Sequence, residues 1–330
     1  MRPKLLAETL SALVELNRPV CIEGAPGGGK TSIVRAVAAQ LDRHYIEVHL
    51  PTMLVEDFGV PSLNEATLRY VLSDWYPAKG SRHDDGRGGV LCFDDRNQAN
   101  ADLQKVLANI QQARTLHGVP LADNWTVVST GNRQSDRAGA NRILSHLRNR
   151  ETVIEMDTHI DDSTEWMLAN NVNPLGIAFL RFRSNLLHDF DPQRDINPTP
   201  RSWVEGVFSL IGSIPASSEM EVFKGAVGEG AAAEFVAFCR VWRKLPSVDA
   251  ILLNPDHGDV PTDPATLYAL SGSLSSRAEN GNFDRILRYT KRMPAEFNVL
   301  TVSLATKRDP ALCATQAFGG WAAANGSVLF

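Results

Sequence analysis

In the first half of the chain, short apolar runs alternate with stretches in which apolar residues recur at helical spacing. The runs rich in β-branched and aromatic residues are residues 19–23, 45–48, 90–93, 125–129 and 153–156. Such runs predict strands, and the unbroken run at 90–93 is typical of a strand buried on both faces of a parallel sheet. Residues 31–41 and 103–110 predict the intervening helices. The alternation predicts an α/β fold in which residues 1–160 form a parallel-sheet domain.

From residue 161 onward the strand-like runs disappear and helical patterns take over. The predicted helical stretches are residues 174–190, 200–211, 219–245, 264–275 and 283–307. Residues 252–263 are rich in Pro, Asp and Gly, which predicts a loop. We therefore expect an all-α second half, with one helical subdomain over residues 161–250 and a C-terminal helical extension over residues 251–330.

Composition narrows the class of protein. The 330 residues are 43% hydrophobic and 22% charged, which is the balance of a soluble globular protein. The formal net charge is -5 and there is no long run of Lys or Arg, which argues against binding to nucleic acid through phosphate neutralisation. No signal peptide is recognisable and no apolar stretch approaches the ~20 residues of a membrane span, so we expect a cytoplasmic protein. The four cysteines are far apart and form no C-x-x-C pair, which predicts free thiols.

The most informative segment follows the first predicted strand and matches the pattern G-x-x-x-x-G-K-[ST] at every fixed position. Its residues are Gly24, Ala25, Pro26, Gly27, Gly28, Gly29, Lys30 and Thr31. Glycines let successive backbone N–H groups point into one concavity, and the helix that follows adds the partial positive charge of its N-terminus. We predict that this loop holds the phosphates of ATP, that Lys30 reaches the β- and γ-phosphates, and that the Thr31 hydroxyl binds Mg²⁺.

A P-loop needs a carboxylate on a neighbouring strand to hold Mg²⁺ through its water shell. Asp94 and Asp95 directly follow the apolar run at 90–93, at the carboxyl end of a predicted strand. Asp94 is the predicted metal-side residue, and Asp95 is placed to polarise the attacking water. The alternative is that both acids only cap the helix that follows.

With these motifs the chain resembles the AAA+ superfamily and, within it, the MoxR-like ATPases. The similarity covers residues 1–210 well and the helical remainder loosely. Residues 129–132 (STGN) resemble the sensor-1 segment, which implies that Asn132 contacts the γ-phosphate or the attacking water; the alternative is an Asn in a left-handed turn. Residues 114–124 resemble the short hairpin that precedes sensor 1 in this branch. Residues 147–150 (LRNR) resemble the arginine-finger region, in which Arg148 and Arg150 are both candidates and Arg150 is favoured.

The resemblance also implies that Arg201 is the sensor-2 arginine of the lid. Thr199 and Pro200 suit the N-cap and first position of a helix. An arginine in the first turn opposes the helix dipole at a cost of about 0.3–1 kcal/mol. Such a mismatch is expected if the guanidinium faces an anion.

The family resemblance implies a ring-forming homo-oligomer, expected to be a hexamer, that hydrolyses ATP and acts as a chaperone-like activator. The implied partner is a protein client carrying a von Willebrand factor A domain. This branch also carries an inserted element, around residues 53–59 and 68–75 here, where we expect a substrate or partner contact. The family usually has Glu where this chain has Asp95, which is one methylene shorter. This departure leaves open a nucleotide-gated assembly or scaffold protein with little turnover. A motor stimulated by nucleic acid is the third alternative, which the net charge disfavours.

Overall fold

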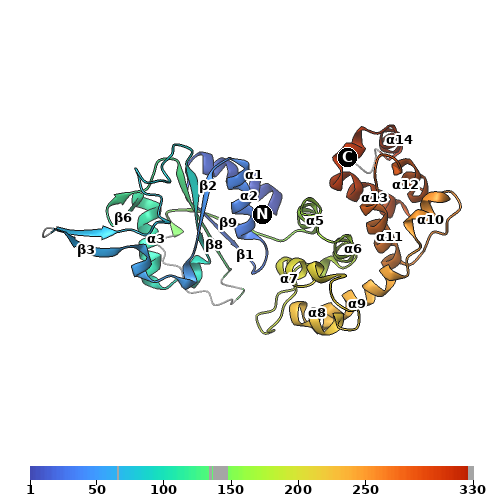
Figure 1. The fold of residues 1–330 in the computed structure, drawn as a ribbon, viewed down its shortest axis with the longest axis horizontal. Coiled ribbons are helices and arrows are strands. Elements are labelled where there is room, and N and C mark those ends of the chain that lie inside the picture. The colour runs from blue at the N-terminus through green and yellow to red at the C-terminus, as the bar shows by residue number, and fades with distance from the viewer. Residues whose placement is uncertain (65–66, 134–135, 137–147, 326–330) are drawn as a thin grey trace. The chain divides into compact units, whose positions relative to one another are not determined.

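The structure is a computed structural model that describes residues 1–64, 67–133, 136 and 148–325 (Figure 1). The chain forms two compact units, one made of Met1–His159 with Phe190–Gln193 and the other of Ile160–Asp189 with Arg194–Phe330. Each unit has its own hydrophobic core. The domain boundaries that the sequence suggests at residues 160 and 250 stay predictions.

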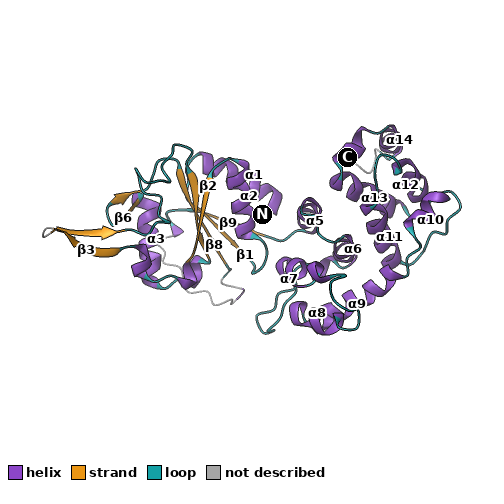
Figure 2. Cartoon of the chain, in the orientation of Figure 1, coloured by secondary structure: helices purple, strands orange, loops and turns teal. Residues whose placement is uncertain are grey.

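A five-stranded parallel sheet forms the centre of the first unit, in the order β2-β5-β8-β1-β9 (Figure 2). Its strands are β1 (Val20–Gly24), β2 (His44–His49), β5 (Gly89–Asp94), β8 (Trp125–Gly131) and β9 (Thr152–Met156). The accompanying helices are α1 (Pro3–Glu15), α2 (Lys30–Gln40) and α3 (Ala101–Ala113). The predicted parallel α/β fold is therefore confirmed.

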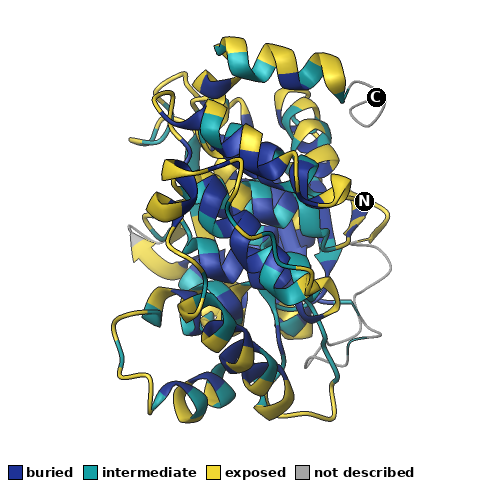
Figure 3. Cartoon of the chain, turned by 90° about the vertical axis from the view of Figure 1, so that its right-hand side faces the viewer, coloured by how far each residue is buried: buried dark blue, intermediate teal, exposed yellow. Residues whose placement is uncertain are grey.

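Side chains of β5 alternate between two hydrophobic cores, one on each face of the sheet. Val90 and Cys92 belong to the cluster that includes residues of α1 and α2. Leu91 and Phe93 belong to the cluster that includes residues of α3. The strand is buried on both faces, as its apolar sequence predicts. Figure 3 colours the whole chain by burial, with buried residues in dark blue.

Two antiparallel hairpins accompany the sheet, β3 (Val60–Asn64) with β4 (Thr67–Val71) and β6 (Thr115–Leu116) with β7 (Val119–Pro120). The second is the hairpin that the sequence indicates within residues 114–124. The first was not foreseen, although it lies within the region expected to carry an inserted element. The Tyr70 ring of β4 stacks on His117 at the turn between β6 and β7, with centroids 3.9 Å apart and planes 3° from parallel. This contact joins the base of the first hairpin to the turn of the second.

Among its described residues, the second unit contains helices joined by loops and no strands, as the sequence predicts. Its helices are α5 (Ile160–Ala169), α6 (Pro174–Phe182), α7 (Pro200–Gly206), α8 (Glu219–Val227), α9 (Glu229–Arg243), α10 (Val248–Leu253), α11 (Pro264–Ser276), α12 (Phe283–Thr290), α13 (Ala295–Arg308) and α14 (Gln316–Ala324). Short 3-10 turns also occur in the chain, at η1 (Leu50–Thr52), η2 (Val55–Phe58), η3 (Arg96–Gln98), η5 (Ser184–Leu186), η6 (Phe208–Leu210) and η7 (Pro310–Ala314). In the described part of the chain, no helix combines the length and apolar character that crossing a bilayer requires.

Four predicted helices were too long. The stretch 219–245 divides at Gly228, whose φ of 81° is outside the helical region. The stretch 283–307 divides before Pro294, which has no N–H to donate to a helix and caps α13 instead. The stretch 174–190 leaves the α-helix after Phe182 and continues as the turn η5. The stretch 200–211 leaves it after Gly206 and continues as the turn η6. In all four cases the apolar spacing continued across the break, so the pattern alone did not show it.

Candidate functional site

The glycine-rich loop joins the end of β1 to the first residue of α2, as the sequence predicts. Gly24 has no room for a side chain, because a Cβ there would lie 2.8 Å from the carbonyl oxygen of Met156 on β9. Gly29 has a φ of 91°, which favours glycine, and a Cβ there would meet nothing within 4 Å. The first glycine therefore allows close packing of two strands, and the second sets the backbone turn into the helix.

Lys30 folds back into this loop. Its side chain is buried, with 7% of its surface exposed, and Nζ donates hydrogen bonds to the carbonyl oxygens of Gly24 and Ala25 at 3.0 Å each. A third bond at 3.0 Å goes to Oδ1 of Asn132, which follows β8. The ammonium group is thus placed at the loop by oxygen atoms from two adjacent strand ends.

Thr31 and Asp94, the two predicted metal-side residues, are in direct contact. The Thr31 hydroxyl donates to Asp94 Oδ1 at 2.7 Å, and the hydroxyl of Thr130 donates to the same oxygen. Thr130 was not singled out in the sequence, although it lies within the STGN segment. The neighbouring strands β5 and β8 bring Asp94 and Thr130 together at the carboxyl edge of the sheet, and Thr31 meets them from the first turn of α2.

Asp95 has a left-handed backbone, with φ 52° and ψ 42°. Its backbone N–H donates to the Thr130 hydroxyl at 3.3 Å. The long helix that follows is capped by Asn100, whose Oδ1 accepts from the N–H groups of Asp102 and Leu103 at 3.1 and 2.9 Å. Asn100 and not the acidic pair therefore caps α3, while Asp95 occupies the N-cap position of the short turn η3 without a side-chain capping bond.

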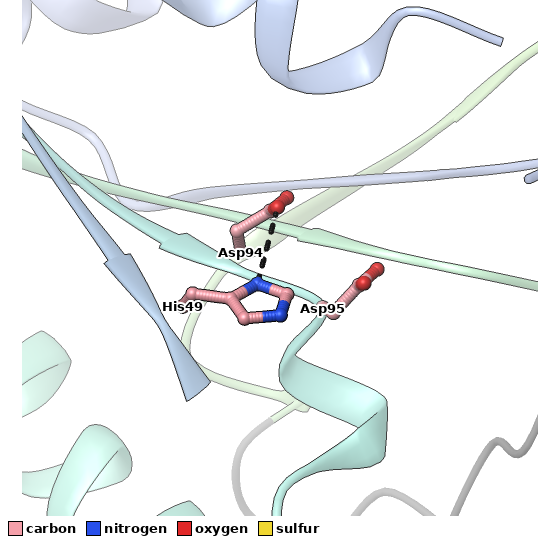
Figure 4. A group of neighbouring side chains, drawn as sticks. All are labelled: His49, Asp94 and Asp95. Carbon is pink, nitrogen blue, oxygen red and sulfur yellow. Dashed lines mark ion pairs between the residues drawn. The ribbon is translucent and has the colours of Figure 1, made fainter. Parts of the chain in front are cut away.

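His49 is a member of the site that sequence reasoning missed. The parallel register of β2 and β5 pairs His49 with Asp94, and its Nδ1 lies 3.6 Å from Asp94 Oδ2. One ligand atom from each of His49, Asp94 and Asp95 lies within 4.8 Å of the other two (Figure 4). The sequence offered no signal for this neighbour, because it does not reveal that β2 lies beside β5.

Asn132 is held by a reciprocal pair of hydrogen bonds with Asn97 of η3. The Asn97 Nδ2 donates to the Asn132 carbonyl oxygen at 2.5 Å, and the Asn132 N–H donates to Asn97 Oδ1 at 3.2 Å. Both residues are buried. This pairing fixes the backbone of Asn132 and leaves its side-chain oxygen directed at Lys30.

Four charged side chains from β1, η3 and the segment before β9 form a connected set of ion pairs. Arg96 is fully buried and contacts both Glu151 and Glu23, with a distance of 3.2 Å to Glu23 Oε1. Arg148 binds the same Glu23 through one nitrogen, at 2.8 and 2.9 Å to its two oxygens, and this pairing raises the pKa of the guanidinium. Of the two arginine-finger candidates, Arg148 is thus paired within its own chain and Arg150 is half-buried. Leu147, the first residue of that segment, lies outside the described residues.

Arg201 belongs to the second unit and is exposed in the first turn of α7. Thr199 caps this helix as predicted, since its hydroxyl accepts from the Ser202 N–H at 3.1 Å and its own N–H donates to Ser202 Oγ at 2.8 Å. The sensor-2 role of Arg201 stays a prediction.

Residues 19–150 match a family model described as AAA domain (dynein-related subfamily). This match lies within the first unit and covers less than half of the chain. The match extends from the start of β1 to Arg150, so it includes the glycine-rich loop, the acidic pair and Asn132. No curated protein matches the chain.

Solved structures with a related fold are more distant. NtrX from Brucella abortus is 15% identical with a TM-score of 0.42, and the match covers 91% of this chain and 67% of that one. The complex of NtrX with ADP is 16% identical with a TM-score of 0.37, covering 71% and 65%. A protein from Cytophaga hutchinsonii is 14% identical with a TM-score of 0.38, covering 92% and 80%.

Proposed function

We propose that this chain is a Mg²⁺-dependent ATPase of MoxR-like AAA+ type that works as a ring-shaped homo-oligomer, a hexamer, and remodels or activates a protein partner. The observation that carries the proposal is the meeting of Lys30, Thr31 and Asp94 beside the glycine-rich loop. This combination places an ammonium group, a hydroxyl and a carboxylate where a triphosphate and its metal ion need them.

The residues present fit both ligands. Backbone N–H groups of residues 27–31 and the N-terminus of α2 suit the phosphates, since helix N-termini favour anions. Lys30 already lies among carbonyl oxygens of the loop, from which it can transfer its hydrogen bonds to phosphate oxygens. Thr31 and Asp94 supply the hard oxygen atoms that Mg²⁺ prefers. When bound, the ion would neutralise charge on the phosphates.

The remaining roles are assigned by position. Asp95 would polarise the attacking water, and Asn132 would orient that water or the γ-phosphate from the neighbouring strand end. Arg150 is proposed as the finger that completes the site of an adjacent subunit, while Arg148 stays paired with Glu23. Arg201 is proposed as the residue of the lid that reports the γ-phosphate.

The hairpin β3–β4 is the proposed contact for the protein partner, which the family resemblance suggests carries a von Willebrand factor A domain. Leu63 and Leu68 are cross-strand partners on one face of this hairpin and have 75% and 61% of their surface exposed. Pro61 and Tyr70 continue the same face toward its base. Exposed apolar side chains on a projecting hairpin are typical of an interaction surface.

A nucleotide-gated scaffold with little turnover is the second candidate, and Asp95 favours it. An aspartate reaches one methylene less far than a glutamate, so a water held by Asp95 would be less tightly positioned. In that case ATP would drive assembly without rapid hydrolysis.

Steady-state ATPase activity against protein concentration tests the proposal. A motor gives turnover that rises steeply as rings form and is abolished in the Lys30→Ala variant. A scaffold binds ATP with Mg²⁺ and assembles, with negligible turnover at every concentration. Stimulation by DNA or RNA would indicate a nucleic-acid motor instead, and absence of ATP binding in every assembly state would refute the proposal.

Mixing two inactive variants tests the shared site. Lys30→Ala subunits retain Arg150, and Arg150→Ala subunits retain the P-loop, so mixed rings contain some intact sites. Loss of a finger supplied by a neighbour costs about 10³–10⁵ in rate in other P-loop enzymes, which leaves ample room to detect rescue. Partial recovery of turnover on mixing supports a composite site, and no recovery in mixed rings contradicts it.

Partner binding is tested with the Asp95→Asn variant, which should keep ATP bound and hold the ring on its client. Replacing Leu63 and Leu68 together by Ser should abolish capture of the client and leave basal ATPase activity unchanged. Leu253 of α10, in the other unit, has 84% of its surface exposed and is a matched control position. Unchanged capture by the hairpin variant would exclude the hairpin as the contact.

A further inference from the structure

The two carboxylate oxygens of Asp94 face different groups. Oδ1 accepts hydrogen bonds from Thr31 and Thr130, on the side of the glycine-rich loop. Oδ2 faces Nδ1 of His49 at 3.6 Å. The side of Asp94 that is directed at His49 is therefore separate from the side that the P-loop threonine occupies.

We propose that His49, Asp94 and Asp95 form a binding site for a divalent transition-metal ion, such as Mn²⁺ or Zn²⁺, that does not require nucleotide. The three side chains come from the end of β2, the end of β5 and the residue that follows it, and they converge as Figure 4 shows. The proposal does not depend on ATP hydrolysis by this chain.

The spacing suits a single ion. Ligand atoms of Zn²⁺ lie about 2.0–2.2 Å from the metal, so two of them are at most roughly 4.4 Å apart. The His49–Asp94 distance of 3.6 Å is within that limit, and all three ligand atoms lie within 4.8 Å of one another. A movement of a few tenths of an ångström would bring the third ligand into range.

The ligand set selects the class of ion. Mg²⁺ prefers oxygen ligands in near-ideal octahedral geometry, whereas an imidazole nitrogen suits transition metals. Two carboxylates with one imidazole therefore favour Mn²⁺ or Zn²⁺ over Mg²⁺. The His49 side chain is 47% exposed and that of Asp94 17%, so solvent can reach the ion and supply its remaining ligands.

Occupation of this site would have a consequence for the nucleotide pocket. The ion would hold the carboxylates of Asp94 and Asp95, which the proposed ATPase uses for Mg²⁺ and for the attacking water. We therefore expect Zn²⁺ to inhibit turnover reversibly through His49.

The decisive experiment titrates the full chain with Mn²⁺ in the absence of nucleotide and follows free Mn²⁺ by electron paramagnetic resonance. We expect one tightly bound ion per chain, with coupling to a nitrogen nucleus in pulsed spectra. Loss of a second-shell partner alone weakens metal binding by about 10–100-fold, so His49→Asn should cost at least as much and should remove the nitrogen coupling. Because His49 is half-exposed, this substitution should leave the fold intact.

His44→Asn is the matched control, since His44 is on the same strand and pairs with Asp85 at 2.7 Å outside the proposed site. It should bind Mn²⁺ as the unaltered chain does, and so should Lys30→Ala, because Lys30 bonds to Gly24, Ala25 and Asn132 and is not one of the three proposed ligands. A chain that binds Mn²⁺ through nitrogen but has no affinity for ATP would support the metal site and refute the proposed ATPase. Weak binding without nitrogen coupling, or binding unaffected by His49→Asn, would overturn the metal site.

Discussion

The Lys30 ammonium nitrogen lies 3.0 Å from Oδ1 of Asn132, a residue 102 positions further along the chain. The contact exists because β1 and β8 are adjacent parallel strands, so their carboxyl ends meet at one edge of the sheet. Lys30 therefore links the loop proposed to hold phosphate with the residue proposed to orient water.

Replacing Lys30 by Ala should weaken ATP binding. A hydrogen bond to a charged group contributes about 1.5–3 kcal/mol, and 1.4 kcal/mol corresponds to about tenfold in Kd. The loss should therefore be about 10–150-fold, measured by calorimetric titration with Mg²⁺ and a non-hydrolysable ATP analogue. Lys79→Ala, at an exposed lysine that pairs with Asp123, should bind the analogue with unchanged affinity. Equal affinities for all three proteins would contradict the assigned role of Lys30.

Replacing Asn97 by Ala should lower turnover more than nucleotide affinity. The substitution leaves the backbone N–H and C=O of Asn132 buried without the partners seen here, which should cost about 1–3 kcal/mol of folding stability. Released from this pairing, the Asn132 side chain would no longer be fixed toward Lys30. Chemical denaturation and steady-state kinetics measure the two effects. Asn109→Ala, at an exposed position of α3, should change neither.

Replacing Arg96 by Met should strongly destabilise the first unit. Arg96 and the side chain of Glu151 are both fully buried, and removing one partner of such a pair leaves an uncompensated charge at a cost of about 3–5 kcal/mol. The double variant Arg96→Met/Glu151→Gln should recover part of this loss in urea unfolding. Lys105→Met, which breaks an exposed pair with Asp102, should cost no more than about 1 kcal/mol. Additive losses in the double variant would show that the two charges do not depend on one another.

Stability should fall as the pH rises above 9, partly because of the buried thiols. Burial raises the pKa of Cys21 from 9.0 to about 11 and that of Cys239 to about 12. The unfolded chain loses these protons near pH 9 while the folded chain keeps them, so each thiol lowers the free energy of unfolding by about 1.4 kcal/mol per pH unit until its folded pKa is reached. Urea unfolding at pH 8, 9 and 10 should show a shallower decline for Cys21→Ala than for the unaltered chain.

The same burial predicts which cysteine is reactive. Cys313 is exposed, and the other three are buried free thiols. One thiol per chain should react rapidly with a disulfide reagent at pH 8, and Cys313→Ser should remove that reaction. Rapid labelling of two or more thiols in the folded chain would contradict the burial of the others.

Features that depend on residues consecutive in the sequence could be predicted from the sequence. The glycine-rich loop, the acidic pair and the strand-forming runs each occupy a few consecutive positions, where local preference and spacing decide the structure. The confirmed parallel sheet and the helical second half follow from such patterns. The breaks at Gly228 and Pro294 were missed because the apolar spacing continued across them, although glycine and proline themselves were the available signal.

What the sequence by itself determined is the chemistry available: a loop of backbone amides, a lysine, a hydroxyl and two carboxylates at the ends of strands. Only the tertiary structure decided which distant side chains join them. The strand order placed His49 beside Asp94, and it brought Glu23 within reach of both Arg96 and Arg148. These partners are 45 to 125 positions apart, and no local preference fixes which strands become neighbours. Strand order is settled by burying two faces of one sheet at once, which is a property of the whole unit.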